Sequence, residues 1–278
     1  MAAPADTHVQ ALARGLDVIT AFDAEHPAMS LSQVAARAGL NRATARRFLH
    51  TLAGLGYVHV AGQRFSLTPR VLRLGTAYLS GFGLPEVAQP HLTDLSARIG
   101  ESASVAVRDG ADAVYVARAA TRRIMTIGIS VGTRLPLYAT SLGRVLLAGL
   151  TSSELEDYLA SAHLRALTPT TVTDADRLRD LVFAARRDGF ALVDSELEAG
   201  LRSIAAPIRC PGRGVVAALN IATLSGVGRP VQEHRELVIA VAAAISDDLA
   251  RVEGVAPSIG GSGSGRAGTG AVGSPWSG

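Results

Sequence analysis

Residues 30–49 read SLSQVAARAGLNRATARRFL, and this stretch decides the fold of the first part of the chain. Ser30 and Gln33 have the spacing of a capping box, in which the serine bonds a free N–H of the first helical turn and the glutamine bonds back. The spacing therefore predicts a short helix over residues 31–38. The helix should stop at Gly39, because glycine best tolerates the left-handed conformation of a helix C-cap.

The residues that follow predict a turn, a second helix and a β-hairpin. Asn41 can cap a helix over residues 42–54. Two short strand-like runs, 57–60 and 64–67, then flank a tight turn at Gly62. Two helices joined by a tight turn and followed by a hairpin form a winged helix-turn-helix.

Two further helices should flank this motif. Residues 8–25 keep one face apolar at spacings of three and four residues, up to the helix-breaking Pro27. A proline can open another helix over residues 69–81. The sequence thus predicts a winged helix-turn-helix domain over residues 1–68 and a linker helix within 69–83.

The charge of this first part is one-sided. No Asp or Glu lies between Glu25 and Glu86. The same span holds seven arginines, namely Arg37, Arg42, Arg46, Arg47, Arg64, Arg70 and Arg73. Residues 1–80 contain eight Arg and four acidic residues, whereas residues 81–253 contain eighteen Arg and twenty acidic residues. Positive charge gathered in this way repels itself and needs an anionic partner, and the partner that fits the predicted fold is DNA.

The predicted helix over residues 42–54 has two faces when it is plotted at about 100° per residue. One face is apolar and should be core: Ala45, Phe48, Leu49, Leu52 and Leu55. The opposite face carries Arg42, Ala43, Arg46, Arg47 and His50. A major groove admits one helix, and the N-terminal half of that helix meets the base edges. The residues expected to contact DNA are Ser32, Arg42, Ala43, Thr44, Arg46, Arg47, His50 and, on the wing, Arg64.

From residue 84 the pattern changes to that of an α+β domain, expected over residues 84–253. Helices are predicted over residues 86–99, 141–149, 152–160, 174–188 and 231–251. Strands are predicted over residues 103–107, 114–117, 124–129, 190–193 and 215–222. Residues 254–278 are rich in Gly and Ser and are predicted to be a disordered tail.

The composition favours an intracellular protein without a metal. Cys210 is the only cysteine, which excludes an intrachain disulfide and a multi-cysteine zinc site. His50 and His59 have no partner at metal-ligand spacing, so neither a metal nor another cofactor is expected. No apolar run approaches the ~18 residues of a membrane-spanning helix, and the N-terminus has no apolar signal core. A cytoplasmic location without membrane contact is therefore expected.

Five motifs of the chain match one family when they are taken together. They are LSQVAARAGL at 31–40, ATARRFL at 43–49, LAGLGY at 52–57, GTRLPLYATSLGR at 132–144 and GLRSIAAPI at 200–208. With them the chain resembles the IclR family of bacterial transcriptional regulators, over residues 8–251. The doubled Arg46-Arg47 and RRIM at 122–125 look most like the branch that regulates protocatechuate and p-hydroxybenzoate catabolism.

This resemblance implies both a fold and partners. The winged helix should bind double-stranded operator DNA, and the linker helix should join it to a GAF-like α+β domain that binds a small metabolite. Members of the family are dimers, often paired into tetramers, that contact each other through the N-terminal region. The resemblance thus implies a homodimer or tetramer that responds to an effector and is not an enzyme.

The resemblance also places an effector pocket at the loop before residue 141, near residues 194–203 and on the strand near 220. The residues expected to line it are Arg134, Tyr138, Ala139, Ser141, Asp194, Arg202, Ser203, Asn220 and Ala222. Family members that bind small keto acids use hydroxyl residues on the strand that here carries Asn220 and Ala222. A ligand of the pyruvate or glyoxylate type is therefore not expected.

Arg134 suggests that the effector is a carboxylate. It lies in an apolar loop bordered by Gly and Pro, without an acid nearby in the sequence. A buried guanidinium needs an anion, and a ligand carboxylate would meet it bidentately. The alternative is that Arg134 pairs with a distant acid such as Asp194. Ser141 could also be the N-cap of the next helix, and Tyr138 could belong to the core.

Four functions are compatible with parts of these patterns. The favoured one is an effector-responsive regulator of aromatic-acid catabolism, acting on protocatechuate, p-hydroxybenzoate or the β-ketoadipate pathway. The alternatives are a regulator of another small-carboxylate pathway and an enzyme with a basic DNA-binding head. Against an enzyme, His163 and His234 lie in polar contexts with no nucleophile motif beside them. An architectural DNA binder would not need the long α+β domain.

Overall fold

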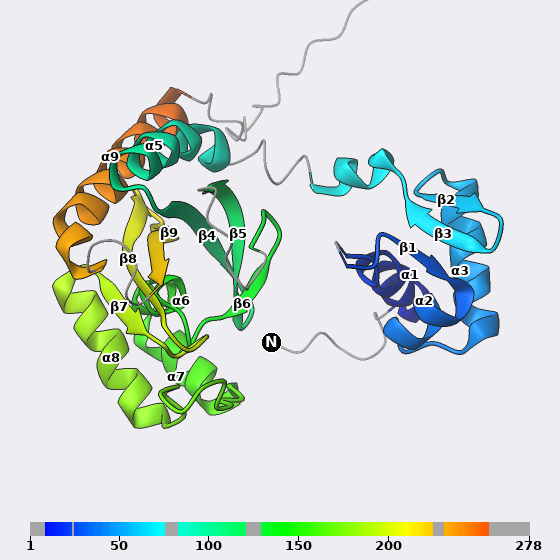
Figure 1. Cartoon of the computed structure of the whole chain (residues 1–278), viewed down its shortest axis with the longest axis horizontal. Coiled ribbons are helices and arrows are strands. Elements are labelled where there is room, and N and C mark those ends of the chain that lie inside the picture. Colours follow the sequence, from blue (N-terminus) through cyan, green and yellow to red (C-terminus); the bar gives the residue numbers. More distant parts are fainter. Residues whose placement is uncertain (1–8, 24, 76–82, 121–128, 225–230, 256–278) are drawn as a thin grey trace, which may run out of the picture. The chain divides into compact units, whose positions relative to one another are not determined.

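The computed structural model describes residues 9–23, 25–75, 83–120, 129–224 and 231–255. The chain divides into two compact units, residues 1–82 and 83–278. Figure 1 shows the first unit in blue to cyan and the second in green to orange. The strand predicted over 124–129 and the tail predicted over 254–278 fall largely outside the described residues.

The first unit is a winged helix-turn-helix, which confirms the predicted fold. Its elements are α1 (Gln10–Thr20), β1 (Ala28–Ser30), α2 (Leu31–Arg37), α3 (Arg42–Gly54), β2 (Val58–Ala61) and β3 (Arg64–Leu67). The three strands form an antiparallel sheet in the order β1-β3-β2. Helices α1, α2 and α3 and strand β1 contribute side chains to one hydrophobic core. Its fully buried residues include Val18, Met29, Val34 and Leu49.

Local side-chain bonds start both helices of the motif as predicted. The Ser30 hydroxyl accepts a hydrogen bond from the Gln33 N–H at 3.4 Å, and the Gln33 side chain accepts one from the Ser30 N–H at 2.9 Å. The Asn41 side chain caps α3 by accepting from the Thr44 N–H at 2.8 Å. Gly39 lies in the turn with φ +64°, a conformation that favours glycine. The turn is therefore set by residues that are close in sequence.

Three details of this unit differ from the prediction. Helix α1 ends at Thr20, because Ala21 and Phe22 turn into the core. Strand β1 was not predicted, since it has three residues and exists only through pairing with β3, for example Met29 opposite Phe65. Leu55, expected in the core, is exposed because α3 ends one residue before it.

The start of the predicted linker helix is described, but not its full course. Pro69–Val71 form a 3-10 turn, η2, that is capped by the Thr68 side chain. Residues 72–75 are helical, and residues 76–82 lie outside the described residues. The linker over 69–83 therefore stays a prediction.

The second unit is an α+β domain, as predicted, built on a six-stranded sheet among its described residues. Its elements are α5 (Leu84–Ile99), β4 (Ser102–Asp109), β5 (Asp112–Ala119), β6 (Arg134–Pro136), α6 (Ser141–Ala148), α7 (Ser152–Ser161), α8 (Ala175–Asp188), β7 (Ala191–Asp194), β8 (Leu201–Cys210), β9 (Gly214–Leu224), η3 (Val231–His234) and α9 (Arg235–Val255). The antiparallel strand order is β6-β5-β4-β9-β8-β7. Helices α5 and α9 pack together against one face of the sheet, whereas α6 covers the other face and contacts α8 (Figure 1).

The sequence did not predict β6 or β8. Strand β8 is buried on both faces, so its residues do not alternate between apolar and polar, and Pro207 interrupts the strand pattern. Strand β6 has three residues at the edge of the sheet and pairs only with β5 among the described strands. Both strands depend on partners far away in the sequence, which a local pattern does not reveal.

Candidate functional site

A narrow cavity lies between the sheet, the start of α6 and the segment 195–200. Its volume is about 20 Å³, which leaves room for about one water molecule. The lining residues are Tyr115, Ile129, Leu135, Ala139, Thr140, Val193, Leu197, Leu201, Ser203, Asn220 and Ala222. A ligand larger than water therefore requires these walls to separate.

Three buried polar side chains on the cavity wall form no hydrogen bond with other described residues. They are Tyr115, Ser203 and Asn220. Burial raises the pKa of Tyr115 to about 12, so its phenol stays neutral and can donate a hydrogen bond. Their polar groups are therefore available to hydrogen-bond a ligand that has polar groups of its own.

None of the described lining residues is charged. Positive potential comes instead from the N-terminus of α6, where backbone N–H groups are aligned. Thr140 is the N-cap: its hydroxyl accepts from the Gly143 N–H at 3.0 Å and donates to the Pro136 carbonyl at 3.1 Å. A Cβ on Gly143 would lie 2.0 Å from the Leu137 carbonyl oxygen, so glycine lets α6 begin this close to the Leu137 backbone.

The structure brings together four of the residues predicted to line an effector pocket: Ala139, Ser203, Asn220 and Ala222. Ser141 is fully buried next to Thr140, and its hydroxyl has no partner among the described residues. The expectation that Ser141 could be the N-cap is wrong, because Thr140 takes that position. Tyr138 packs in the core, and its hydroxyl donates to the Arg165 carbonyl at 2.9 Å.

The expectation that Arg134 is buried is wrong. The Arg134 side chain is 49% exposed on the edge strand β6 and pairs with Asp109 at 2.6 Å and Asp112 at 3.1 Å. Antiparallel pairing of β5 with β6 brings the arginine back to the β4–β5 turn that carries both acids. Arg134 thus pairs with distant acids, as the alternative proposed, although not with Asp194.

Asp194 and Arg202 form an ion pair with each other. They face each other in the β7–β8 hairpin, with the Arg202 Nε at 2.8 Å from the Asp194 carboxylate. Hydrogen bonds from the Ser195 hydroxyl and from Arg202 hold the pKa of the Asp194 carboxyl below its ordinary value. Neither side chain is among the residues that line the cavity.

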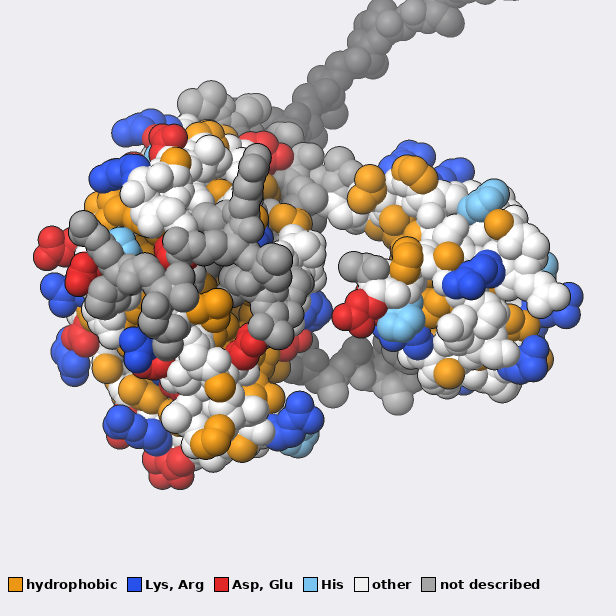
Figure 2. All heavy atoms as spheres, in the orientation of Figure 1, with side chains coloured by type: hydrophobic (Ala, Val, Ile, Leu, Met, Phe, Trp, Pro, Cys, Tyr) orange, Lys and Arg blue, Asp and Glu red, His pale blue; other side chains and the backbone are white. Residues whose placement is uncertain are grey.

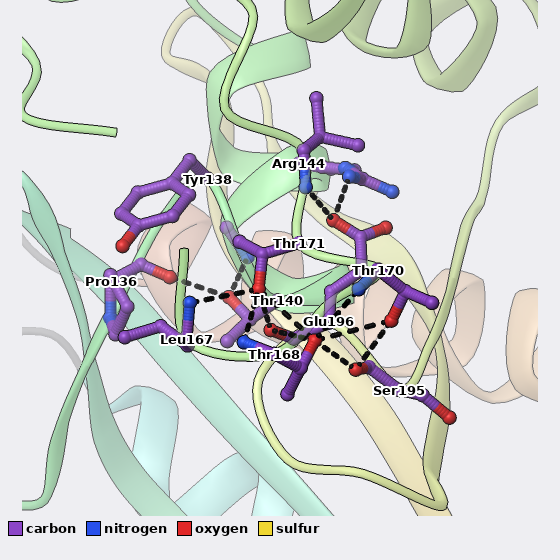
Figure 3. A network of polar contacts seen from close by, with 12 residues as sticks. Pro136, Tyr138, Thr140, Arg144, Leu167, Thr168, Thr170, Thr171, Ser195 and Glu196 are labelled. Carbon is purple, nitrogen blue, oxygen red and sulfur yellow. Dashed lines mark hydrogen bonds and ion pairs between the residues drawn. The ribbon is translucent and has the colours of Figure 1, made fainter. Parts of the chain in front are cut away.

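Sequence reasoning missed a buried ion pair that joins α6 to the segment 195–200. The Arg144 guanidinium donates to the Glu196 carboxylate at 2.7 Å, and the two side chains are 3% and 9% exposed (Figure 3). Burial lowers the pKa of Arg144, and the negative charge of Glu196 opposes that shift. No local pattern signals this pair, because 52 residues separate its members.

Threonine hydroxyls hold the same segment from the other side (Figure 3). Thr168 donates to the Ser195 carbonyl at 2.6 Å, and Thr171 donates to the Glu196 carbonyl at 2.6 Å. The next residue, Leu197, lines the cavity. The ion pair and the threonines therefore position one wall of the cavity.

In the first unit, α3 presents the basic face that was predicted to contact DNA. Arg42, Arg46 and Arg47 are exposed, and their guanidinium groups form no hydrogen bond or ion pair with other described residues. The other predicted contacts on the two helices are exposed or half-buried: Ser32, Ala43, Thr44 and His50. On the face drawn in Figure 2, basic side chains are spread over this unit and acidic ones gather at one place.

Arg64 differs from the arginines of α3. Its guanidinium donates to the Ala28 carbonyl at 2.6 Å and so ties the wing to β1. The remaining hydrogens of the guanidinium stay available, since the side chain lies at an exposed position.

Two family models match this chain. One describes the IclR helix-turn-helix domain and matches residues 11–61, and the other describes the bacterial transcriptional regulator IclR C-terminal domain and matches residues 76–247. The chain belongs to the IclR family. This membership confirms the prediction that the protein is a DNA-binding transcriptional regulator and not an enzyme.

Similar proteins include two curated regulators and one solved structure. The Pca regulon regulatory protein of Pseudomonas putida is 45% identical over 84% of this IclR-family chain and 80% of its own. The p-hydroxybenzoate hydroxylase transcriptional activator of Acinetobacter baylyi is 37% identical over 77% of this chain and 81% of its own. An IclR homologue from Microbacterium hydrocarbonoxydans, crystallised with 4-hydroxybenzoate, is 28% identical with a TM-score of 0.77, over 86% of this chain and 99% of its own.

One hydrolase-like pattern in this IclR-family chain does not have the matching structure. Residues 128–132 read GISVG, the GxSxG pattern of a nucleophile elbow. The Ser130 N–H bonds the Thr133 hydroxyl at 2.9 Å in an exposed turn. This turn leads into strand β6, where an elbow requires a helix. Separately, no helix in the described part of the chain is long and apolar enough to cross a membrane.

Breaking the buried pair should destabilise the second unit. Removing one partner leaves the other charge buried, which costs about 3–5 kcal/mol. We expect Glu196→Gln and Arg144→Met each to lower the free energy of unfolding by this amount, and the double variant by less than the sum. Urea unfolding followed by circular dichroism measures the loss. The control is Arg134→Met, which breaks an exposed pair and should cost about 0–1 kcal/mol; equal losses in all variants would contradict the prediction.

Proposed function

We propose that this IclR-family protein is a dimeric regulator of aromatic-acid catabolism that binds an aromatic acid in the cavity beside α6. The assignment to this pathway rests on the 45% identity, over most of both chains, to the Pca regulon regulatory protein of Pseudomonas putida. The homologue crystallised with 4-hydroxybenzoate supports the class of ligand. A regulator of another small-carboxylate pathway is the alternative.

The chemistry of the cavity fits an aromatic acid. Apolar side chains such as Leu135, Leu197 and Leu201 supply a wall for a ring, and the phenol and amide groups of Tyr115 and Asn220 offer hydrogen bonds to its polar ends. Because the described lining residues are uncharged, the carboxylate would meet neutral donors and the positive end of α6. At positions 220 and 222 the strand carries Asn and Ala instead of the hydroxyl side chains expected for a keto-acid ligand.

An aromatic acid should stabilise the folded protein. A ligand at 100 times its Kd adds about 2.7 kcal/mol to the free energy of unfolding. We expect 4-hydroxybenzoate or protocatechuate to raise the melting temperature in a thermal-shift assay, with β-ketoadipate as the third acid to compare.

Asn220→Leu tests the site itself. The variant keeps the volume and removes the amide, and we expect its affinity for the aromatic acid to fall by about tenfold or more, since a hydrogen bond to a charged group contributes about 1.5–3 kcal/mol. The control is Thr223→Val on the same strand, where the buried Thr223 does not line the cavity. Unchanged affinity of Asn220→Leu in isothermal titration would exclude this cavity as the effector site.

We further propose that the exposed arginines of α3 read the operator. Arg42, Arg46 and Arg47 would contact bases or flanking phosphates. Ser32 and Thr44 would contact phosphates, and Arg64 would reach the backbone or the minor groove. The absence of a described carboxylate partner for Arg42, Arg46 and Arg47 supports this role, because uncompensated guanidinium groups favour an anionic partner.

Arg46→Ala should weaken operator binding by about 1–3 kcal/mol and reduce the preference for the operator over other sequences. A gel-shift titration with operator and competitor duplexes measures both quantities. Wild-type affinity in this variant would contradict the assignment of α3 as the reading helix. A wild-type protein without preference for its own promoter would indicate an architectural binder.

We also propose that α1 mediates dimerisation. Val9, Leu12 and Leu16 are 64%, 65% and 49% exposed on one side of the first unit. An apolar patch of this kind is more stable when a second copy covers it. A dimer would place two reading helices on one operator.

Replacing Leu12 and Leu16 by Gln should convert the dimer to a monomer. Operator binding should then weaken, because each half-site of the operator would be bound by an independent monomer. Sedimentation velocity measures the mass, and gel shift measures the binding. Leu55→Gln is the control, since Leu55 is also exposed but lies at the end of α3. A double variant that stays dimeric would overturn this role of α1.

A further inference from the structure

A polar cleft separates α1 from α3 in the first unit. Its volume is about 320 Å³. Gln10 and Arg14 line it from α1, and Thr44, Arg47 and Thr51 line it from α3. The ring of Phe48 forms part of its floor where the two helices approach each other. A Cβ added to Gly15 would lie 3.8 Å from this ring.

The cleft places two uncompensated positive charges near each other. Neither the Arg14 guanidinium nor the Arg47 guanidinium has a hydrogen bond or ion pair with another described residue. Asp17, the acid one turn along α1, does not pair with Arg14, and the Asp23 carboxylate is already bonded to Arg37 and His26. Two guanidinium groups on one cleft favour an anion between them.

The position of the cleft on α3 indicates which anion this is. Thr44, Arg47 and Thr51 follow each other at spacings of three and four residues, so they line the side of α3 that turns towards α1. A helix in the major groove meets base edges along its centre and meets the sugar-phosphate backbone along its flanks. The cleft lies on such a flank, which favours a phosphate over a base.

We propose that this cleft binds one backbone phosphate of the operator, with Arg14 and Arg47 as its charged donors. A guanidinium matches phosphate oxygens bidentately, and the Thr44 hydroxyl and the Gln10 amide can add neutral donors. Thr51 shapes the wall only, because its hydroxyl already donates to the Arg47 carbonyl at 3.0 Å. The proposal rests on the proposed operator binding; it extends the DNA site to α1 and assigns Arg47 to a phosphate.

A phosphate contact differs from a base contact in what it contributes. It strengthens binding to operator and unrelated DNA alike, and it releases counterions, so binding depends more steeply on salt. Arg14 therefore adds affinity and fixes the register of α3, while sequence preference depends on Arg42 and Arg46.

The test is Arg14→Gln in the full-length protein, with Kd measured by fluorescence anisotropy for an operator and an unrelated duplex over a range of KCl concentrations. We expect both affinities to fall by a similar factor, on the order of tenfold, and the slope of log K against log salt to decrease by about 1. The control is Arg37→Gln, whose arginine is already paired with Asp23 and should leave the slope unchanged. Thermal unfolding checks that each variant folds.

The outcomes separate this proposal from operator binding in general. If the wild type fails to bind the operator, the proposed function itself fails. If the wild type binds and Arg14→Gln keeps the same Kd and slope, only the phosphate site is overturned. A loss on the operator alone would mean that Arg14 reads bases, and dissociation into monomers would mean that the cleft is a subunit contact; either result overturns the phosphate assignment.

Discussion

The buried ion pair between Arg144 and Glu196 fixes the walls of the cavity in the second unit, which is called the effector unit below. The first unit is called the DNA-binding unit. It joins the helix α6, whose N-cap lines the cavity, to the segment that supplies Leu197. Two charges taken out of water are stable only while they face each other, so neither element can move far alone. A cavity of about 20 Å³ must open to admit an aromatic acid, and the pair limits how the walls can separate. Binding of an aromatic acid at the proposed site would therefore be coupled to the position of this segment.

Two groups of arginines in this chain have opposite surroundings. In the effector unit Arg134, Arg144 and Arg202 each meet a carboxylate, and the pairs fix hairpins and helices. In the DNA-binding unit Arg14 and the three arginines of α3 have no such partner among the described residues. The first group stabilises a fold, whereas the second leaves a positive surface that an external anion can neutralise. The surroundings of an arginine thus decide whether it is structural or binds a ligand.

Much of the DNA-binding unit could be predicted because its signals are local. Ser30, Gln33 and Asn41 each bond a backbone N–H a few residues away, and the apolar spacing of α3 defines its buried face. The effector site was predicted less well. Ala139, Ser203, Asn220 and Ala222 were placed by family resemblance and do line the cavity, but the argument from Arg134 failed, because its acids lie across two strands. Thr140 and Tyr115 were missed, since a lining position depends on how strands and helix are packed.

The sequence by itself determined the winged helix-turn-helix, the basic face of α3 and the family, because caps, helical spacing and charge can be read from neighbouring residues. Only the tertiary structure decided which charged side chains are paired with an opposite charge and which are not. Strand pairing across the sheet neutralises Arg134, and a contact between residues 52 positions apart buries Arg144 against Glu196. Packing of α1 on α3 brings Arg14 to the same cleft as Arg47. The physical reason is that Coulomb and burial energies depend on distance in space, which the order of residues along the chain does not specify.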